Sequence, residues 1–343
     1  MSDENQSMPA YDSPQNDPEP DDPGHIASFS INGKTLAQIM KIKDEGKRKA
    51  TMAAYQAALD AYMTTKAGGE ATPKVYTEKP TTVSAPKTQS PKVVQLPVWA
   101  DAVRGVPNVA LRSALFGVVE RGKRAYLERE TIHAQSGVII RYTGMRLDQA
   151  DLDVWEQCLH LARARPLEMR VVFSGHGFLK AIGRNTSGAN SEWLKGVFSR
   201  LQATSVEMDD GQGHAYAGPL ILHWARDENT GFHAIELNPQ IAGLYGQDGW
   251  TGIAWDQRLN LKQNQLAKWL HGFYASHAHP YPVKVTTLRA MSGSESEALF
   301  HFRDKLREAL KIVAKSTGWT WKIDKNDLVH IDKTESVNRD GGT

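Results

Sequence analysis

Residues 260–331 have the sequence NLKQNQLAKWLHGFYASHAHPYPVKVTTLRAMSGSESEALFHFRDKLREALKIVAKSTGWTWKIDKNDLVHI. The first apolar residues recur at intervals of three and four, which places them on one face of a helix. Pro280 and Pro282 end that helix, and the β-branched residues that follow favour a short extended segment before a brief helix over residues 288–291. The first helix face consists of Leu266, Trp269, Leu270 and Phe273, and the extended segment contains Val283, Val285, Thr286 and Thr287.

A long amphipathic helix follows a turn at Gly293, and Ser294 is placed to cap its N-terminus. After Gly318, apolar and polar residues alternate on both sides of a turn from Asp324 to Asp327, which predicts a hairpin. A helix, a short strand, two more helices and a hairpin are the elements of a winged helix, with the long helix as recognition helix and the hairpin as wing. The buried face of the long helix is Leu299, Phe302, Leu306, Leu310 and Val313, and the apolar hairpin residues are Trp319, Trp321, Ile323, Leu328, Val329 and Ile331.

An internal repeat extends this prediction to the preceding residues. Trp155 stands eleven residues before Pro166, as Trp269 stands eleven before Pro280, and the two copies are 114 residues apart. After Pro166 the same order recurs: an apolar strand, a short helix, Gly183, a turn rich in Ser and Asn, a longer amphipathic helix and strands. Two tandem winged helices are the simplest interpretation. The fold class that we predict is therefore α+β, with a disordered and helical N-terminal extension.

Four runs carry a family resemblance: LPVWADAVRGVPNVALRSALFGV, IIRYTGMRLDQADLDVWEQCLHLAR, FSRLQATSV and YASHAHPYPVKVTTLRAMSGS. In this order they resemble the TrfA-type replication initiators of broad-host-range plasmids, and the likeness covers residues 96–331. The resemblance implies binding of repeated origin sequences (iterons), a switch between a dimer and a DNA-binding monomer, and cooperation with a host helicase and a host initiator protein. It also implies that the first domain forms the dimer, for which we expect the strands after Leu201 to self-associate.

Composition agrees with a protein that binds nucleic acid. Residues 1–30 contain seven acidic and no basic side chains, so the rest of a chain of net charge +2 carries +9. Such an excess suits phosphate contact, although a solvated basic surface is its commoner cause. No run of about 18 apolar residues and no signal peptide is present, which predicts a cytoplasmic protein. The lone cysteine, Cys158, lies on an apolar helix face and is expected in the core.

The sequence predicts six segments. Residues 1–33 are acidic and poor in apolar residues, which predicts disorder. Residues 34–66 are rich in helix formers, and residues 67–95 form a linker rich in Pro, Thr and Lys. The first winged helix, with an elaborated wing after its recognition helix, is expected at 96–237 and the second at 238–331. Residues 332–343 form a disordered tail.

No catalytic machinery is evident in the sequence. A self-contained ATPase needs G-x-x-x-x-G-K-[ST], which no segment contains, and no Cys/His spacing suits zinc. We therefore expect neither enzyme activity nor a cofactor or metal. One alternative stays open: His277 and His279, with Tyr274 and Tyr281 nearby, resemble the metal-binding pair and nucleophile of rolling-circle nicking initiators. These histidines alternatively end the helix before Pro280, favourably placed against its dipole.

The candidate DNA contacts lie in both predicted winged helices. In the first, small polar groups at a helix N-terminus reach phosphates or base edges, unless Ser187 or Asn190 only caps the helix. These candidates are Arg184, Asn185, Thr186, Ser187, Asn190, Ser191 and Lys195.

In the second winged helix, three candidates occupy the first turn of the recognition helix and four follow. Arg303, one of these four, is the expected bidentate reader of guanine. The wing residues suit phosphate or minor-groove contact, and the alternative for the helix is an ordinary solvated surface. The helix candidates are Ser294, Ser296, Glu297, His301, Arg303, Lys305 and Arg307, and the wing candidates are Lys322, Lys325 and Asn326.

The sequence thus predicts a non-enzymatic plasmid replication initiator whose two winged helices bind one iteron as a monomer, with recognition helices in successive major grooves. A repressor of similar fold and the metal-dependent nicking initiator are the alternatives.

Overall fold

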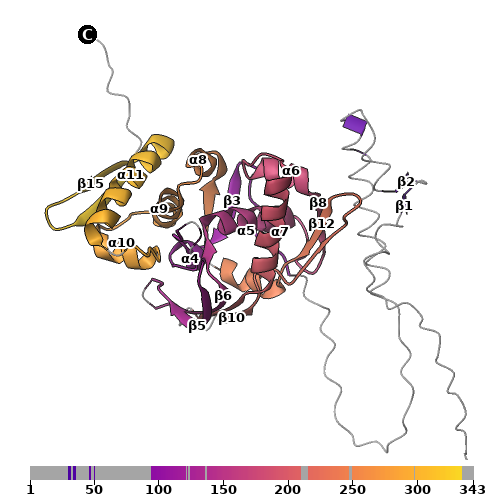
Figure 1. The fold of residues 1–343 in the computed structure, drawn as a ribbon, viewed down its shortest axis with the longest axis horizontal. Coiled ribbons are helices and arrows are strands. Elements are labelled where there is room, and N and C mark those ends of the chain that lie inside the picture. Colours follow the sequence, from indigo (N-terminus) through magenta and orange to yellow (C-terminus); the bar gives the residue numbers. More distant parts are fainter. Residues whose placement is uncertain are drawn as a thin grey trace, which may run out of the picture. The chain divides into compact units, whose positions relative to one another are not determined.

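The structure is a computed structural model of the chain. It describes residues 94–333 apart from 121, 123, 136, 210–214, 247–248 and 297, together with residues 30–31, 34–35, 46–47 and 50. The chain forms two compact units, residues 1–81 and 82–343 (Figure 1). The expected disorder before residue 30, the expected linker up to residue 93 and the expected tail after residue 333 lie outside the described residues.

In the first unit, strand β1 (Ser30–Ile31) pairs antiparallel with β2 (Lys34–Thr35), and residues 46, 47 and 50 are helical. The sequence predicts disorder up to residue 33 and a helix from Lys34, and both predictions are wrong for these strands. The strands flank the pair Asn32-Gly33, which favours a tight hairpin turn.

Two segments of the second unit share one order of elements. The first contains α5 (Gln149–Ala162), β8 (Val171–Ser174), α6 (Gly175–Ala181), α7 (Gly188–Gln202), β11 (His223–Arg226) and β12 (Phe232–Glu236). The second contains α9 (Gln265–Ala275), β14 (Val283–Lys284), α10 (Val285–Met291), α11 (Leu299–Thr317), β15 (Thr320–Ile323) and β16 (Leu328–Asp332).

Strand order strengthens the correspondence between the two segments. Each has a three-stranded antiparallel sheet in which the last strand is central: β11-β12-β8 in the first and β15-β16-β14 in the second. The internal repeat inferred from Trp155 and Trp269 is therefore present both in the order of the elements and in their pairing.

The first two strands after α7 do not belong to a wing, contrary to the prediction of an elaborated wing. Strands β9 (Ser205–Asp209) and β10 (Ala215–Gly218) instead join β6 (Ile139–Met145) and β5 (Tyr126–Ile132) in a separate sheet of order β10-β9-β6-β5. Packing explains this pairing, because alternate residues of β9 and β6, such as Val206 and Ile140, are fully buried in the same core.

The remaining elements close the first core. Strand β13 (Trp250–Ala254) returns to pair antiparallel with β3 (Val103–Pro107), which leads into α4 (Asn108–Leu111), and β4 (Phe116–Gly117) pairs parallel with β7 (Leu147–Asp148). A 3₁₀ helix, η1 (Pro239–Tyr245), precedes β13, and α8 (Trp255–Asn260) follows it. Within the residues that the structure describes, no helix is both long and apolar enough to span a bilayer.

Two hydrophobic cores result. The first runs from Leu96 to Trp255 and contains Cys158, which is fully buried as predicted. The second runs from Leu261 to Ile331. Residues 238–255 thus contribute to the first core, through Ile241 and Ile253 among others, whereas the sequence assigns them to the second domain. Pairing of β13 with β3 is the reason, and it joins residues too far apart in the chain for a local pattern to reveal.

A buried ionic network joins the two cores. Arg258 of α8 is completely buried, and its Nε–H donates to Asp153 Oδ1 of α5 over 2.8 Å. Its Nη2 donates to the carbonyl oxygen of Gln149, 3.3 Å away. Lys268 of α9 forms an ion pair with the second oxygen of Asp153. Because a buried charge without a partner is very costly, these groups fix α8 and α9 against α5.

The Glu156 carboxylate lies in the same network without a hydrogen bond of its own. Its Oε2 is 2.8 Å from Arg258 Nε, but that N–H is directed at Asp153, and neither oxygen of Glu156 accepts a hydrogen bond from the described residues. Burial raises the pKa of Glu156 to about 7, against the opposing effect of Arg258. The carboxyl is therefore close to half protonated near neutral pH.

Further contacts extend the junction between the cores. Trp269 Nε1 donates to the carbonyl oxygen of Ser113 over 3.0 Å. The backbone N–H of Val118 donates to the carbonyl oxygen of Ser292 over 2.7 Å. Arg146 donates to the carbonyl oxygen of Gly293 over 2.8 Å and pairs with Glu295. The turn before α11 is therefore held by the first core as well as by the second.

We expect Arg258→Met to lower the free energy of unfolding by about 3–5 kcal/mol, because it leaves two buried carboxylates with less compensation. The partly exposed pair between Arg170 and Glu236 supplies the control, and Arg170→Ala should cost less than about 1 kcal/mol. Urea denaturation of the three proteins measures both values. Equal small losses for the two variants would show that Arg258 does not join the cores.

A second prediction concerns pH. Because the pKa of Glu156 is raised from 4.5 to about 7, the folded state binds an extra proton between these values. The resulting stabilisation is complete below pH 4.5 and is lost as the pH rises to about 7, at up to about 1.4 kcal/mol per pH unit. Glu156→Gln removes this dependence, so its free energy of unfolding should rise relative to the parent protein over that range.

Urea denaturation of both proteins from pH 4.5 to 8 measures this difference. Other groups, such as His160 and His233, whose pKa values burial lowers to about 4, titrate in both proteins and cancel. If the difference in free energy of unfolding between the two proteins stayed constant with pH, the raised pKa of Glu156 would be contradicted.

Candidate nucleic-acid interface

Helix α11 presents one apolar and one charged face. Phe302, Leu306 and Leu310 are buried in the second core as predicted, with Ala309 and Val313. The opposite face carries Phe300, His301, Asp304, Lys305, Arg307, Glu308, Lys311 and Lys315, all exposed. An amphipathic helix of 19 residues with one exposed side is a suitable surface for a groove in DNA.

The N-terminus of α11 differs from the prediction. The helix begins at Leu299 with Ala298 as its N-cap and no side-chain cap, so Ser294 and Ser296 precede the first turn. The Ser294 hydroxyl accepts a hydrogen bond from the amide of Ser296, whose side chain is buried. Glu297 lies outside the described residues. Gly293, at φ 62°, reverses the chain after α10, and Arg146 then holds it.

The preceding helix also begins earlier than predicted. Residues Val285, Thr286 and Thr287 are expected to be extended, yet they form the first turn of α10. Val285 and Leu288 are both fully buried, and their spacing of three brings them together on one helix face. Core packing therefore outweighs the β-propensity of these residues.

The guanidinium of Arg303 is bound to the hairpin. Its Nε–H donates to Asp327 Oδ1 over 3.1 Å, and Nη2 donates to Oδ2 of the same carboxylate. This bidentate pair joins α11 to the turn between β15 and β16. Nη1 donates no hydrogen bond to a described residue, so one edge of the planar group stays available to a ligand. Asp327, which is not among the predicted DNA contacts, therefore sets the orientation of the Arg303 guanidinium.

Three further cations of α11 are also near carboxylates. Lys305 Nζ is 3.1 Å from Glu120, and Arg307 is 3.1 Å from Asp304 one turn away. Lys311 similarly lies 2.7 Å from Glu308. Such exposed pairs contribute little stability, and phosphate oxygens can replace the carboxylates. His301 stacks on its neighbour Phe300, with 3.9 Å between ring centroids.

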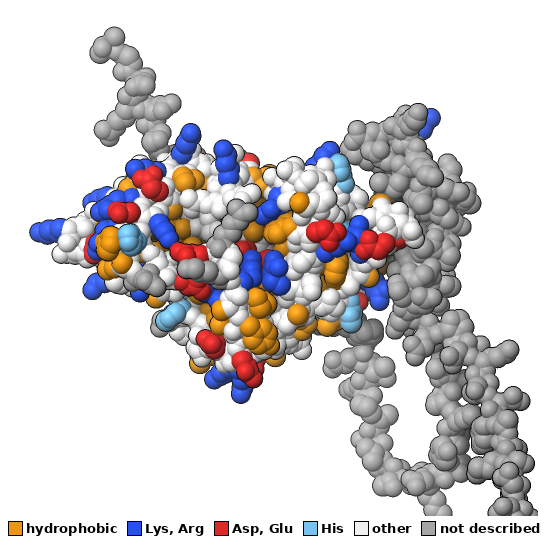
Figure 2. Space-filling model, viewed as in Figure 1, with side chains coloured by type: hydrophobic (Ala, Val, Ile, Leu, Met, Phe, Trp, Pro, Cys, Tyr) orange, Lys and Arg blue, Asp and Glu red, His pale blue; other side chains and the backbone are white. Residues whose placement is uncertain are grey.

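The hairpin forms a short projection with polar residues at its end. Asp324 Oδ1 accepts hydrogen bonds from the amides of Asn326 and Leu328, which fixes the turn. Lys322, Lys325 and Asn326 are exposed. Figure 2 shows Lys and Arg side chains at the end of the molecule formed by β15 and β16, with acidic groups among them. The placement of all three predicted wing residues allows contact with a phosphate backbone.

Helix α7 presents the corresponding surface in the first segment. Ser187 is its N-cap, and its hydroxyl accepts from the amide of Asn190, so capping is one role of this residue. Asn190 Nδ2 donates to the carbonyl oxygen of Asn185 over 3.0 Å. Thr186 is exposed and Ser191 is half-buried.

Two basic side chains near α7 already have partners. The guanidinium of Arg184 lies over the ring of Trp193 at 3.5 Å, and burial lowers its pKa. Lys195 is 2.9 Å from Glu192 and 3.6 Å from Glu228 on the β11–β12 turn. Trp193 is not among the predicted site residues. Its position nine residues after Arg184, across a turn, is a weak sequence signal of this contact.

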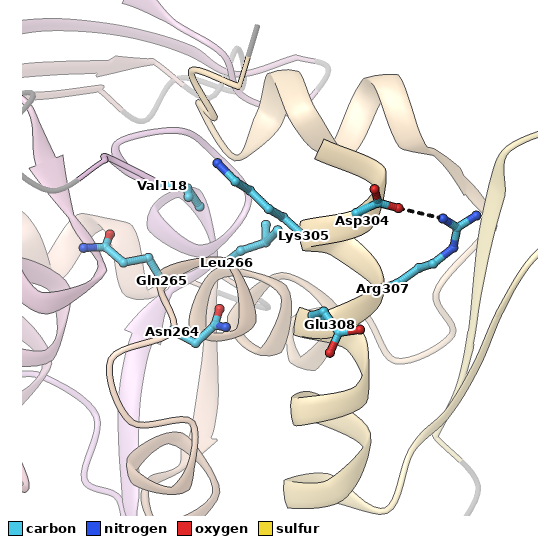
Figure 3. A pocket seen from close by; sticks show the side chains of 8 residues that line it. All are labelled: Val118, Asn264, Gln265, Leu266, Asp304, Lys305, Arg307 and Glu308. Atoms are coloured by element: carbon cyan, nitrogen blue, oxygen red, sulfur yellow. Dashed lines mark hydrogen bonds and ion pairs between the residues drawn. The ribbon is translucent and has the colours of Figure 1, made fainter. Parts of the chain in front are cut away.

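A groove of about 650 Å³ lies beside α11. Figure 3 shows four α11 residues on one side of it, the start of α9 on the other, and Val118, which packs against the second core, at its edge. Acidic and basic groups alternate along its wall, so it lacks the single-signed charge of a phosphate site. Its lining residues are Val118, Asn264, Gln265, Leu266, Asp304, Lys305, Arg307 and Glu308.

The residues of the nicking alternative do not form one site. His277 follows Ser276, the C-cap of α9, and its Nδ1–H donates to the carbonyl oxygen of Phe273 over 2.7 Å. Burial lowers the pKa of His277, which favours the neutral ring over a cation at the helix dipole. The Tyr274 side chain is fully buried, whereas Tyr281 is 84% exposed. Among the described residues, no group of three or more His, Cys, Asp or Glu side chains is arranged to hold a metal.

The chain is therefore a mixed α/β protein with a duplicated unit and one exposed, polar helix in each copy. It belongs to the TrfA family, whose model, described as TrfA protein, matches residues 63–333. The plasmid replication initiator protein TrfA of Escherichia coli is 29% identical over 242 residues, which are 68% of this chain. The chain spans only 62% of the length of that curated relative.

Solved structures of two initiators resemble the chain more remotely. Domains 2 and 3 of RctB have a TM-score of 0.48 at 12% identity, over 66% of this chain and 96% of that one. The Pi initiator protein in complex with iteron DNA has a TM-score of 0.42 at 12% identity, over 53% of this chain and 92% of that one.

Two serines that the sequence treats alike should differ when replaced. Ser187→Ala removes the cap of α7 and should lower the free energy of unfolding by about 1 kcal/mol. Ser294→Ala should cost only a few tenths of that, because Ser294 does not cap α11. Thermal denaturation of both variants tests this. A larger loss for Ser294→Ala would mean that α11 begins at Ser294, as the sequence predicts.

Proposed function

We propose that the chain is a plasmid replication initiator that binds iteron repeats at its origin. Membership of the TrfA family is the observation that carries this proposal, together with the name of the Escherichia coli relative. Duplication of the unit in residues 149–332 gives it a physical basis, because two similar surfaces can read two segments of one duplex.

Each duplicated unit acts as a winged helix. Helices α7 and α11 are the recognition helices, and the β11–β12 and β15–β16 hairpins are the wings. The sheet order, with the last strand between the other two, supports this identification. A monomer then binds one iteron with the two helices in successive major grooves, which lie one helical turn apart.

Arg303 reads guanine from a fixed position in this proposal. Asp327 engages Nε and one hydrogen of Nη2, so the guanidinium keeps one orientation while Nη1 and the remaining Nη2 hydrogen face the ligand. Such a carboxylate partner reduces the side-chain entropy lost on binding. The wing residues Lys322, Lys325 and Asn326 contact phosphate, as do Asn185, Thr186 and Lys195 at the start of α7.

Origin opening depends on binding energy and on host proteins in the cytoplasm, a helicase and a host initiator, rather than on an ATPase of the chain. A dimer that binds iterons poorly regulates this activity. The sheet formed by β5, β6, β9 and β10 is a suitable surface for it, because Tyr126, Ile139 and Met145 on β5 and β6 are exposed apolar residues. Sedimentation that shows a monomer at all concentrations would contradict the dimer.

The test is a titration of the protein on duplexes from its own plasmid origin and on scrambled duplexes, at two salt concentrations. We expect ladders that count the repeats and survive the higher salt. Arg303→Ala should weaken specific binding by about 1–3 kcal/mol and relax specificity at one base pair. Arg170→Ala, a change on the exposed edge of the first core, is the control and should leave binding unchanged. Equal, salt-sensitive binding to both duplexes would refute the proposal.

A further inference from the structure

A large apolar side chain is exposed on the proposed recognition helix. Phe300, the second residue of α11, is 58% exposed. The other large apolar side chains that are exposed in the described part of the chain lie on strands or connecting segments, at Val98, Tyr126, Ile139, Met145 and Tyr281. The ring contributes little to the core, and its place on the proposed recognition helix leaves it accessible to a ligand of that helix.

The geometry of α11 directs Phe300 away from the core. Successive residues of a helix are 100° apart, so Phe300 lies on the same outward face as Asp304, Arg307 and Lys311, opposite Phe302 and Leu306. The neighbouring ring of His301, with its centroid 3.9 Å away, packs against the phenyl group and limits its orientations. The ring is thus both exposed and partly preorganised.

Charges around Phe300 are already balanced. Arg307 is paired with Asp304, Arg303 with Asp327, and Lys311 with Glu308. The first half of the outward face therefore offers little net charge and one apolar group. In the major groove, the apolar group on a base edge is the 5-methyl of thymine, and phenylalanine is among the side chains that contact it.

We propose that Phe300 reads a thymine through van der Waals contact with its 5-methyl group, and so determines specificity at one base pair. The inference rests on the proposed function, since it requires α11 in the major groove. It adds a residue that hydrogen-bonding criteria do not select, and it gives the iteron one required base. A protein partner is the less favoured ligand, because the charged groups beside the ring would have to be desolvated with it.

The experiment replaces the thymines of an iteron duplex one at a time by deoxyuridine, which removes only the methyl group. For the parent protein we expect one position at which affinity falls about fourfold, the effect of burying one methyl less. Phe300→Ala should bind the unmodified duplex about tenfold more weakly and should lose the difference between thymine and uracil there. Phe300→Leu, which keeps an apolar side chain, should retain part of the difference in affinity between thymine and uracil.

Tyr281→Ala supplies the matched control, because it removes another exposed ring, from the connection between α9 and β14, that has no role in the proposed function. It should keep the thymine dependence of the parent protein. Melting temperatures of all variants should match, since the two rings are exposed.

The inference is overturned if Phe300→Ala keeps the full thymine dependence, or if the parent protein binds thymine and uracil duplexes equally at every position while still preferring iterons. Unchanged DNA binding by Phe300→Ala, with weakened capture of a replication protein, would identify the ring as a protein contact and also overturn it. Failure of the parent protein to prefer iterons over scrambled duplex would instead refute the proposed function.

Discussion

The guanidinium of Arg258, completely buried between the two hydrophobic cores, constrains the rest of the second unit. It is held by Asp153 and Glu156 of α5, while Lys268 of α9 shares Asp153. Buried charges tolerate little displacement, because each lost contact leaves a charge in a medium of low polarity. A hydrophobic junction of the same area would allow sliding, whereas this one specifies a single arrangement of α5, α8 and α9. The positions of α7 and α11 follow from that arrangement.

The duplicated unit gives this constraint its functional meaning. A recognition helix whose cations are mostly paired with carboxylates binds DNA weakly by itself, as the ion pairs along α11 illustrate. Two such helices held at a fixed separation can bind one duplex with little further loss of freedom, and affinity then reflects preorganisation more than net charge. Contacts such as that between Arg146 and Gly293 extend the same restraint to the turn just before α11.

Much of the fold could be predicted from local patterns. The spacing of Trp269 and Phe273, the seam of α11 and the hairpin around Asp324 each depend on neighbours in the chain, and the structure contains all three. The repeat allowed the same pattern to be inferred around Trp155. Errors arose where distant residues decide the outcome: β9 pairs with β6, β13 pairs with β3, and packing of Val285 extends α10.

The site was predictable to a smaller degree. Lys305 and Arg307 lie on the exposed face of α11, as the helical pattern predicts. Their partners cannot be read from a sequence, so the pattern predicts Arg303 without Asp327 and predicts Ser294 as a cap, which it is not. Arg258 offered no signal, because an isolated arginine in a sequence is far more often a surface residue. The helical pattern places Phe300 on the outward face, yet only its exposure in the structure distinguishes it from a core phenylalanine.

The most direct test of a rigid pair of recognition surfaces is the affinity for an iteron with one base pair inserted between the two segments that the protein protects. One base pair moves one segment by about 3.4 Å and rotates it by about a tenth of a turn. If the network around Arg258 fixes the two helices, binding should fall to the level of a scrambled duplex. Affinity that is unchanged by the insertion would contradict a rigid arrangement of α7 and α11, because it would mean that the two helices adjust independently to the DNA.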